Sequence, residues 1–327
     1  MYRNRRFFLL GFCLLILFLE GSVRLAQPWL RRISPTYYYR QYMETLLRPS
    51  PVLVWEGIPG SEAQIANSAG RTLSYKRNSL GWREGEFAPF GAAVNGLVLG
   101  DSFSFGMGVA KEERFSEQLE QRLPGMNVWN QGEIGYAPDQ YLLLAERWLP
   151  PFPWNFLVIQ LSNNDLNDVA GHIWVAPHST TGIPAELRAP PPYHWISGAS
   201  ELWNLFAYFA LLEKEKRLSD EKLEDGLKRL LFSLRQTVVL AQARKVPVIL
   251  LQASDWGEQA YGSRLAAAYR EGVTALVKDL SIPLLEAKAD AQGLLPFPDL
   301  HWTAHSHARA ADLLLPELRR ILSPKKK

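Results

Sequence analysis

A serine that could act as a nucleophile stands directly after a short apolar run, in the sequence Gly100-Asp101-Ser102. The run over residues 96–100 is continuous and ends in glycine, which is typical of a buried strand in a parallel sheet. At a glycine-lined turn into a helix, a serine hydroxyl is free of neighbouring side chains and lies beside backbone N–H groups that can bind an oxyanion. The same tripeptide also fits an ordinary turn capped by its own side chains.

The base and the carboxylate that such a serine needs occur together near the C-terminus, as Asp299 and His301. A hydroxyl nucleophile requires a general base to take its proton, and an imidazole base requires a carboxylate to orient it. One loop that carries both residues can supply both groups. Ser102, His301 and Asp299 are therefore the candidate catalytic residues.

Two further segments carry hydrogen-bond donors suited to an oxyanion hole. Residues 130–136 contain two glycines, and residues 162–165 read Ser-Asn-Asn-Asp. A glycine N–H and an asparagine side-chain amide are donors that stabilise the negative charge of a tetrahedral intermediate. Taken singly, each segment also fits an ordinary loop.

The elements that must position these residues alternate between strands and helices. Apolar runs predict strands at residues 96–100, 127–130, 156–161, 247–251 and 283–285. Helices are predicted at residues 115–123, 138–149, 202–212 and 223–238 and in a closing segment through residue 322. This alternation predicts an α/β fold, a three-layer α/β/α sandwich with a parallel sheet. Ligands bind at the carboxyl ends of such strands. Every candidate segment directly follows a predicted strand, except the loop that carries Asp299 and His301.

The order of these segments resembles that of the SGNH (GDSL-type) hydrolase superfamily. The matching blocks are Gly100-Asp101-Ser102, Gly135, Asn164-Asp165 and Asp299 with His301, and the resemblance covers residues 94 to the last helix. It implies a flavodoxin-like sheet, with Ser102 as nucleophile, His301 as base and Asp299 as its partner. It also implies an oxyanion hole made of the Ser102 N–H, the Gly135 N–H and the Asn164 amide.

The sequence departs from the common family pattern in two places, and one of them indicates a particular branch. Ser162 stands where the third block has glycine, and one residue instead of two separates Asp299 from His301. The Asp-x-His-Trp pattern is similar to that of membrane-anchored alginate O-acetylation proteins, as is the Asn-Ser-Leu-Gly-Trp-Arg segment at residues 78–83. The resemblance implies an esterase or acetylhydrolase that acts on O-acyl esters of a cell-envelope carbohydrate. An O-acetyltransferase that uses the same acyl-enzyme, or a non-catalytic carbohydrate-binding or assembly protein, remains the alternative.

The N-terminus has the composition of a membrane-targeting segment. Arg3, Arg5 and Arg6 precede an unbroken apolar run over residues 7–19. As a helix this run covers about 20 Å, against roughly 30 Å of hydrocarbon core, so an anchor must extend toward residue 26. An uncleaved anchor is favoured over a cleaved signal peptide, because no convincing small-residue cleavage site follows. The leading arginines then place the remainder outside the cytoplasm.

The chain accordingly divides into three predicted parts. Residues 1–27 form the anchor or signal segment, and residues 28–93 form a membrane-proximal linker with short strands. Residues 94–327 form the hydrolase-like domain, with an insertion at about 169–218. Trp174, Tyr193, His194 and Trp195 in this insertion could form a roof over the site that stacks on a sugar, or pack beneath a surface loop.

Composition excludes several other classes. An apolar content of 47 % excludes a disordered chain, and a net charge of +3 gives no argument for nucleic acid as a partner. The single cysteine, Cys13, excludes an intramolecular disulfide and a zinc–cysteine cage. His301 and His305 have a metal-ligand spacing, but the glutamate of a zinc protease motif is absent. No metal and no organic cofactor is expected, and the sequence identifies no protein partner.

Overall fold

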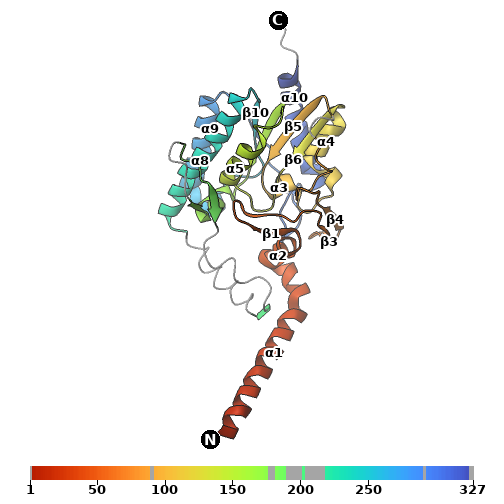
Figure 1. Cartoon of the computed structure of the whole chain (residues 1–327), viewed down its shortest axis with the longest axis vertical. Helices are drawn as coiled ribbons and strands as arrows, with labels where there is room; N and C mark the ends of the chain where they lie inside the picture. Colours follow the sequence, from red (N-terminus) through yellow and green to blue (C-terminus); the bar gives the residue numbers. More distant parts are fainter. Residues whose placement is uncertain are drawn as a thin grey trace.

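A five-stranded parallel sheet forms the centre of the protein in the computed structural model, which describes residues 2–88, 92–175, 181–188, 201–202, 218–289 and 292–323 (Figure 1). Its strands are β5 (Val94–Leu99), β6 (Met126–Asn130), β7 (Phe156–Leu161), β10 (Val248–Gln252) and β11 (Leu284–Glu286). They lie in the order β11-β10-β7-β5-β6, and neighbouring strands are parallel. Counted along the chain, this is the 2-1-3-4-5 order of flavodoxin-like sheets.

Alternate side chains of each strand face two separate helical layers. On β7, Leu157 and Ile159 join one apolar core, whereas Phe156 and Val158 join the other. The first core is covered by α5 (Pro138–Trp148), α8 (Asp220–Ala243) and α9 (Glu258–Asp279), and the second by α4 (Phe115–Arg122) and α10 (Ala304–Leu322). The predicted α/β/α sandwich is confirmed. Helix α9 was not among the predicted elements.

The loops after β5, β6 and β7 meet at the carboxyl edge of the sheet. After β5 come the single turn α3 (Ser102–Phe105) and the 3₁₀ turn η1 (Lys111–Glu113), and after β7 comes α6 (Asp165–Gly171). Because β5 and β7 are neighbours whose connections leave in opposite directions, their ends flank the point where ligands bind in doubly wound sheets. Ser102 and Asn164 follow these two strands.

A long helix, α1 (Tyr2–Ile33), extends away from the body as a single rod (Figure 1). Over Leu10–Ile33 it is long and apolar enough to cross a membrane, and it exposes side chains such as Phe18 and Leu25. A single helix of this kind near the N-terminus fits a membrane anchor and a signal sequence alike. The helix is longer than the apolar run that marks it in the sequence.

The segment predicted as a linker with short strands also contains a helix that packs on the body. Helix α2 (Pro35–Leu46) follows α1 after one residue, Ser34. Two antiparallel pairs then form, β1 (Leu47–Ser50) with β2 (Val54–Gly57) and β3 (Glu62–Ala66) with β4 (Thr72–Lys76). Tyr38 and Tyr42 of α2 share an apolar core with Phe105 and Ile134, which lie beside the candidate site.

The predicted insertion is described in part. It contributes an antiparallel pair, β8 (Ile173–Val175) and β9 (Glu186–Arg188). The Leu187 N–H donates to the Val52 carbonyl at 2.8 Å and joins this pair to the β1–β2 turn. Tyr193, His194, Trp195 and, beyond its first residue, the helix expected at 202–212 lie outside the described residues.

Candidate active site

The candidate serine, histidine and aspartate form one continuous series of contacts. Ser102 opens α3 directly after β5, and its Oγ lies 2.7 Å from Nε2 of His301. Nδ1 of His301 lies 2.7 Å from Oδ1 of Asp299. When Nδ1 carries the proton that this carboxylate accepts, Nε2 is left to accept the serine hydroxyl. The structure thus brings together three residues that the sequence separates by up to 199 positions.

The short spacing between Asp299 and His301 is accommodated by the backbone of the residue between them. Leu300 has a φ of +59°, in the left-handed region, which costs a residue with a side chain about 1–2 kcal/mol. The His301 carbonyl accepts the Leu295 N–H at 2.7 Å, which fixes the end of the loop. The turn at Leu300 allows the two side chains to meet although only one residue separates them.

The turn that presents Ser102 is held by its neighbours. Oδ1 of Asp101 accepts the Phe103 N–H at 2.8 Å and caps α3. Oε1 of Gln160, on β7, accepts the Asp101 N–H at 3.0 Å and the Ser104 hydroxyl at 2.8 Å. A Cβ at Gly100 would lie 2.5 Å from that same oxygen, so the close approach of β5 to Gln160 requires glycine there.

Arg83, in the segment at residues 78–83, donates hydrogen bonds to the chain that follows this turn. The Arg83 guanidinium donates to the carbonyls of Gly106 at 2.7 Å and Val109 at 2.8 Å, and it lies 4.2 Å from the Tyr75 ring centroid. These carbonyls end the turn that Ser102 begins, and a buried helix end needs such a donor. Burial lowers the pKa of Arg83 to about 10, so it keeps its positive charge at neutral pH.

Two of the three predicted oxyanion donors are backbone N–H groups. Among the described residues, neither the Ser102 N–H nor the Gly135 N–H has a hydrogen-bond acceptor. Gly135 has a φ of +71°, and the indole of Trp55 lies 3.0 Å from where its Cβ would be. The Glu133 N–H donates to the Gly100 carbonyl at 3.1 Å and holds the Gly135 loop beside the serine turn. Both N–H groups are available to a ligand.

The third predicted donor, the Asn164 side-chain amide, is held at both ends. Its nitrogen donates to Oδ2 of Asp168 at 2.6 Å, and its oxygen contacts the hydroxyl of Ser162. Because an amide nitrogen carries two hydrogens, one remains for an oxyanion. Burial raises the pKa of Asp168 to about 7, so the contact to an ionised carboxylate forms above neutral pH. Ser162, the departure from the family glycine, also contacts the carboxylate of Asp101 and links the two loops.

If Asn164 supplies an oxyanion donor, Asn164→Ala lowers kcat by about 10²–10³ and changes KM little, because the lost hydrogen bond acts in the transition state. Steady-state kinetics on a soluble ester measure the effect. Asn163→Ala is the matched control: its side chain reaches toward Asp255 at 3.5 Å, on the other side of the loop. Equal rates for Asn164→Ala and wild type would remove Asn164 from this role.

Two tyrosines of α2, within the predicted linker, reach the same site. The Tyr38 hydroxyl donates to Oδ2 of Asp299, and the Tyr39 hydroxyl donates to the Asp299 carbonyl. The Tyr39 ring also meets the His301 ring edge to face, with centroids 5.7 Å apart. The signal in the sequence was the spacing of Tyr38 and Tyr42 by one helical turn after a proline at the first helical position.

The other histidines of this region have separate environments. His305 is exposed, whereas His307 is buried and its Nδ1 accepts the Phe115 N–H at 3.3 Å. Burial, together with the positive charge of Arg114, lowers the pKa of His307 to about 3 and keeps it neutral. Within the residues that the structure describes, no group of three metal-ligating side chains is found.

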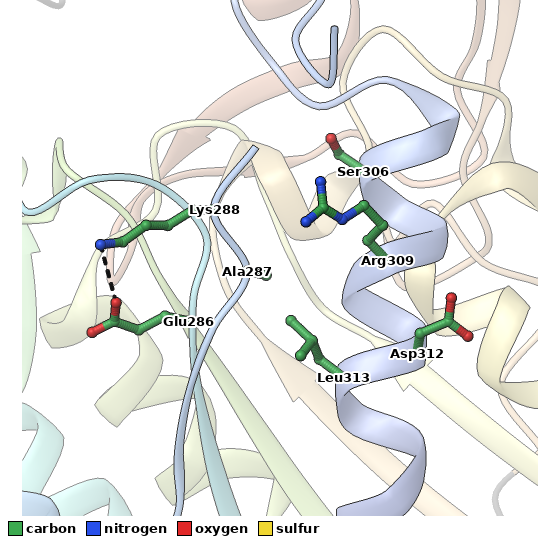
Figure 2. A pocket seen from close by; sticks show the side chains of 7 residues that line it. All are labelled: Glu286, Ala287, Lys288, Ser306, Arg309, Asp312 and Leu313. Carbon is green, nitrogen blue, oxygen red and sulfur yellow. Dashed lines mark ion pairs between the residues drawn. The ribbon is translucent and has the colours of Figure 1, made fainter. Parts of the chain in front are cut away.

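A hollow of about 400 Å³ lies elsewhere, between the end of β11 and helix α10 (Figure 2). Its lining residues are Glu286, Ala287, Lys288, Ser306, Arg309, Asp312 and Leu313. Neither the serine, the histidine nor the aspartate of the candidate site lines it. Two basic and two acidic side chains share its wall, and Lys288 pairs with Glu286 at 3.2 Å. The formal charges of these lining side chains therefore balance. Because none of the candidate catalytic residues lines the hollow, it is separate from the site around Ser102.

Comparison with known proteins gives similar solved structures only. TesA superposes with a TM-score of 0.47 at 18% identity, over 70% of this chain and 99% of its own. The esterase EstA from Pseudoalteromonas sp., in a form inhibited by monoethylphosphonate, gives 0.45 at 15% identity over 70% and 98%. A carbohydrate acetylesterase family member from Sinorhizobium meliloti gives 0.42 at 14% identity over 70% and 99%. No protein-family model and no curated protein matches the chain. These similarities are distant, and the chemistry of the site rests on its own residues.

Proposed function

We propose that the protein is a serine-dependent esterase of the SGNH type that acts on O-acyl esters through an acyl-enzyme on Ser102. The observation that carries this proposal is the pair of 2.7 Å contacts that join Ser102 to His301 and His301 to Asp299. A serine, a base and an orienting carboxylate in this order are the arrangement that activates a hydroxyl for acyl transfer. Two N–H groups without acceptors beside the serine suit the charge that develops on the carbonyl oxygen.

The first half of the reaction forms the acyl-enzyme. Oγ of Ser102 attacks the ester carbonyl carbon while Nε2 of His301 takes the hydroxyl proton. The carbonyl oxygen becomes an oxyanion, which the N–H groups of Ser102 and Gly135 and the amide of Asn164 bind. The bond to the alcohol then breaks, and the leaving oxygen receives the proton from Nε2. Asp299 stabilises the positive imidazolium throughout and keeps its own negative charge.

The second half of the reaction returns the serine to its resting state. A water molecule, or the hydroxyl of a sugar, loses its proton to Nε2 of His301 and attacks the acyl carbon. The bond from that carbon to Oγ of Ser102 breaks, and Oγ regains the proton from Nε2. Water gives a carboxylic acid, and a sugar gives a new ester. The acceptor is decided by what the site positions and by how well it excludes water.

The finer part of the proposal is that the ester is an O-acetyl group on a cell-envelope carbohydrate. It is supported by the Asp-x-His-Trp pattern and the 78–83 segment, which resemble those of membrane-anchored polysaccharide-modifying proteins. The half-buried indole of Trp55, placed against Gly135, offers an aromatic wall beside the oxyanion hole. The same patterns favour O-acetyl transfer as the second candidate function, since that branch includes acetyltransferases.

One assay separates these candidates. Purified full-length protein in detergent micelles is given an activated acetyl ester, alone and with a range of glycan acceptors, and free acetate and acetylated glycan are both measured. We expect acetate release that Ser102→Ala abolishes. Acetylated glycan as the main product would establish the transferase instead. Absence of both products, with a folded protein and acyl esters of several chain lengths, would refute the esterase proposal.

We also propose that α1 anchors the protein and that the remainder lies outside the cytoplasm. A reporter that functions only in the cytoplasm, fused after Lys327, should therefore give no signal, whereas the same reporter fused before Met1 should give a strong one. Because Arg31 and Arg32 follow the apolar segment, replacing Arg3, Arg5 and Arg6 by asparagine should weaken this orientation. A strong signal from the C-terminal fusion of the wild-type chain would reverse the topology.

A further inference from the structure

We propose that Tyr38, on helix α2 in the predicted membrane-proximal linker, is a positioning residue that supports the catalytic triad by holding Asp299. This inference rests on the proposed function, because it concerns how the carboxylate orients the base His301. The inference adds the Tyr38 hydroxyl, 261 positions before Asp299, to the groups of the candidate site. The consequence is that residues ahead of the predicted hydrolase-like domain belong to its active site.

The two oxygens of the Asp299 carboxylate have separate partners. Oδ1 faces Nδ1 of His301 at 2.7 Å, and Oδ2 accepts the Tyr38 hydroxyl proton. The Asp299 side chain is inaccessible to solvent, so water does not reach either oxygen, and Tyr38 is itself only 3 % exposed. A hydrogen bond from a buried neutral donor to a buried carboxylate is among the stronger kinds. With both oxygens occupied, the carboxylate plane is fixed, and Oδ1 stays directed at the imidazole.

The Tyr38 hydroxyl and the Asp299 carboxylate lie among packed groups. The Tyr38 hydroxyl lies 3.2 Å from the hydroxyl of Tyr42, one helical turn later, and the Tyr42 ring meets the Tyr75 ring edge to face at 5.3 Å. On the other side of the carboxylate, Gly108 leaves no space, because a Cβ there would lie 2.9 Å from Oδ2 of Asp299. The donor and the acceptor are thus enclosed by packed groups, and the Tyr42 hydroxyl is a second contact of the Tyr38 hydroxyl.

The ionisable groups around Asp299 are consistent with donation of the hydrogen bond from the Tyr38 hydroxyl to the Asp299 carboxylate. The titratable groups that face it are Tyr38 and Tyr39 from α2, Tyr75 from β4 and His301 from its own loop. Burial, reinforced by the negative charge of Asp299, raises the pKa of Tyr38 well above its usual value. Tyr38 is therefore protonated at every pH at which the enzyme works and can only donate to the ionised carboxylate.

Helix α2 also contacts the insertion, at Glu201. The Arg40 guanidinium forms two hydrogen bonds with the Glu201 carboxylate, at 2.6 and 2.9 Å. The carboxylate of Glu20, on α1, accepts the backbone N–H of Glu201 at 3.0 Å. Helices α1 and α2 thus contact the same short stretch of the insertion, and only Ser34 lies between them. Helix α2 thus contacts the insertion through Arg40 and the His301 loop through Tyr38.

The test compares Tyr38→Phe with Tyr42→Phe in the full-length protein. Both changes remove one buried tyrosine hydroxyl from the same helix, but only the first removes a partner of Asp299. We expect Tyr38→Phe to lower kcat by about 10- to 100-fold with KM within about two-fold, and Tyr42→Phe to lower kcat by less than about three-fold. Thermal unfolding of both variants shows whether each is folded at the assay temperature.

The pH profile separates positioning from a structural role. A carboxylate that loses a buried donor interacts more strongly with the imidazolium form of His301, so the acid limb of kcat/KM in Tyr38→Phe, which reports protonation of this base, should move to higher pH. The low-field proton resonance of the His301 Nδ1–H gives a second readout that needs no substrate, and we expect Tyr38→Phe to shift it and Tyr42→Phe to leave it in place.

An unchanged resonance and an unmoved acid limb in a folded Tyr38→Phe variant would overturn the inference and leave the proposed function standing. A wild-type chain without ester turnover would refute the proposed function. In that case the resonance alone still decides whether Tyr38 orients the Asp299–His301 pair.

Discussion

Ser102→Ala should abolish ester turnover while the protein remains folded. The hydroxyl is the attacking atom in the proposed mechanism, and removal of a serine nucleophile lowers kcat by roughly 10⁶-fold in hydrolases of this type. The Oγ of Ser102 contacts Nε2 of His301 as its hydrogen-bond partner, so the alanine variant leaves the base in place and removes no packing. Hydrolysis of an activated ester, measured with thermal unfolding of the same samples, gives both results.

A second serine in the same turn provides the control for this variant. Ser104 is fully buried two residues later, and its hydroxyl donates to Oε1 of Gln160 at 2.8 Å rather than to His301. Ser104→Ala leaves that oxygen with the backbone N–H groups of Asp101 and Ser104 as donors, so we expect kcat within a few-fold of wild type. Substantial turnover in Ser102→Ala, or equal losses in the two variants, would contradict the assignment of the nucleophile.

Asp299→Asn should lower kcat by about 10⁴-fold with little change in KM. An asparagine can place an N–H where the carboxylate accepted the proton of His301 Nδ1, and the imidazole then adopts the tautomer that carries its proton on Nε2. In that state Nε2 no longer accepts the Ser102 hydroxyl proton. Steady-state kinetics across pH measure the loss, and a variant with more than about one tenth of the wild-type kcat would show that Asp299 does not orient the base.

The matched control is Asp139→Asn, which alters a buried aspartate–histidine pair away from Ser102. Oδ2 of Asp139 lies 3.0 Å from Nδ1 of His172, and both side chains are buried. Burial by itself lowers the pKa of His172, but the negative charge of Asp139 outweighs this effect and raises the pKa. The pair therefore stabilises the fold at low pH, and this contribution is lost as the pH rises through the raised pKa. Asp139→Asn should lower Tm mainly at low pH and keep kcat within a few-fold.

The sheet and the residues at its edge could be predicted because their patterns are local. Each strand is a continuous apolar run. Ser102 and Asn164 follow the runs of two strands, so the parallel arrangement alone places them at one edge of the sheet. The pairing of Asp299 with His301 lies within three residues. The left-handed turn at Leu300 that makes this pairing possible could not be predicted, because leucine has no preference for that conformation.

The contribution of α2 could not be predicted for a different reason. The contact from Tyr38 to Asp299 joins positions 261 residues apart, and three consecutive tyrosines beside prolines also fit an irregular linker. Their role becomes visible only when α2 packs against the His301 loop. The orientation of the Asn164 amide likewise depends on Ser162 and Asp168, whose side chains converge only after α6 forms.

Covalent trapping tests the central claim, that Ser102 is a nucleophile activated by His301, most directly. The full-length protein is treated with a fluorophosphonate, which reacts with serines activated in this way, and the site of modification is found by peptide mass analysis. We expect one phosphonyl group per chain, on Ser102, with labelling lost in Ser102→Ala and strongly slowed in His301→Ala. A folded wild-type protein that acquires no adduct, or that acquires it on another residue, would contradict the account.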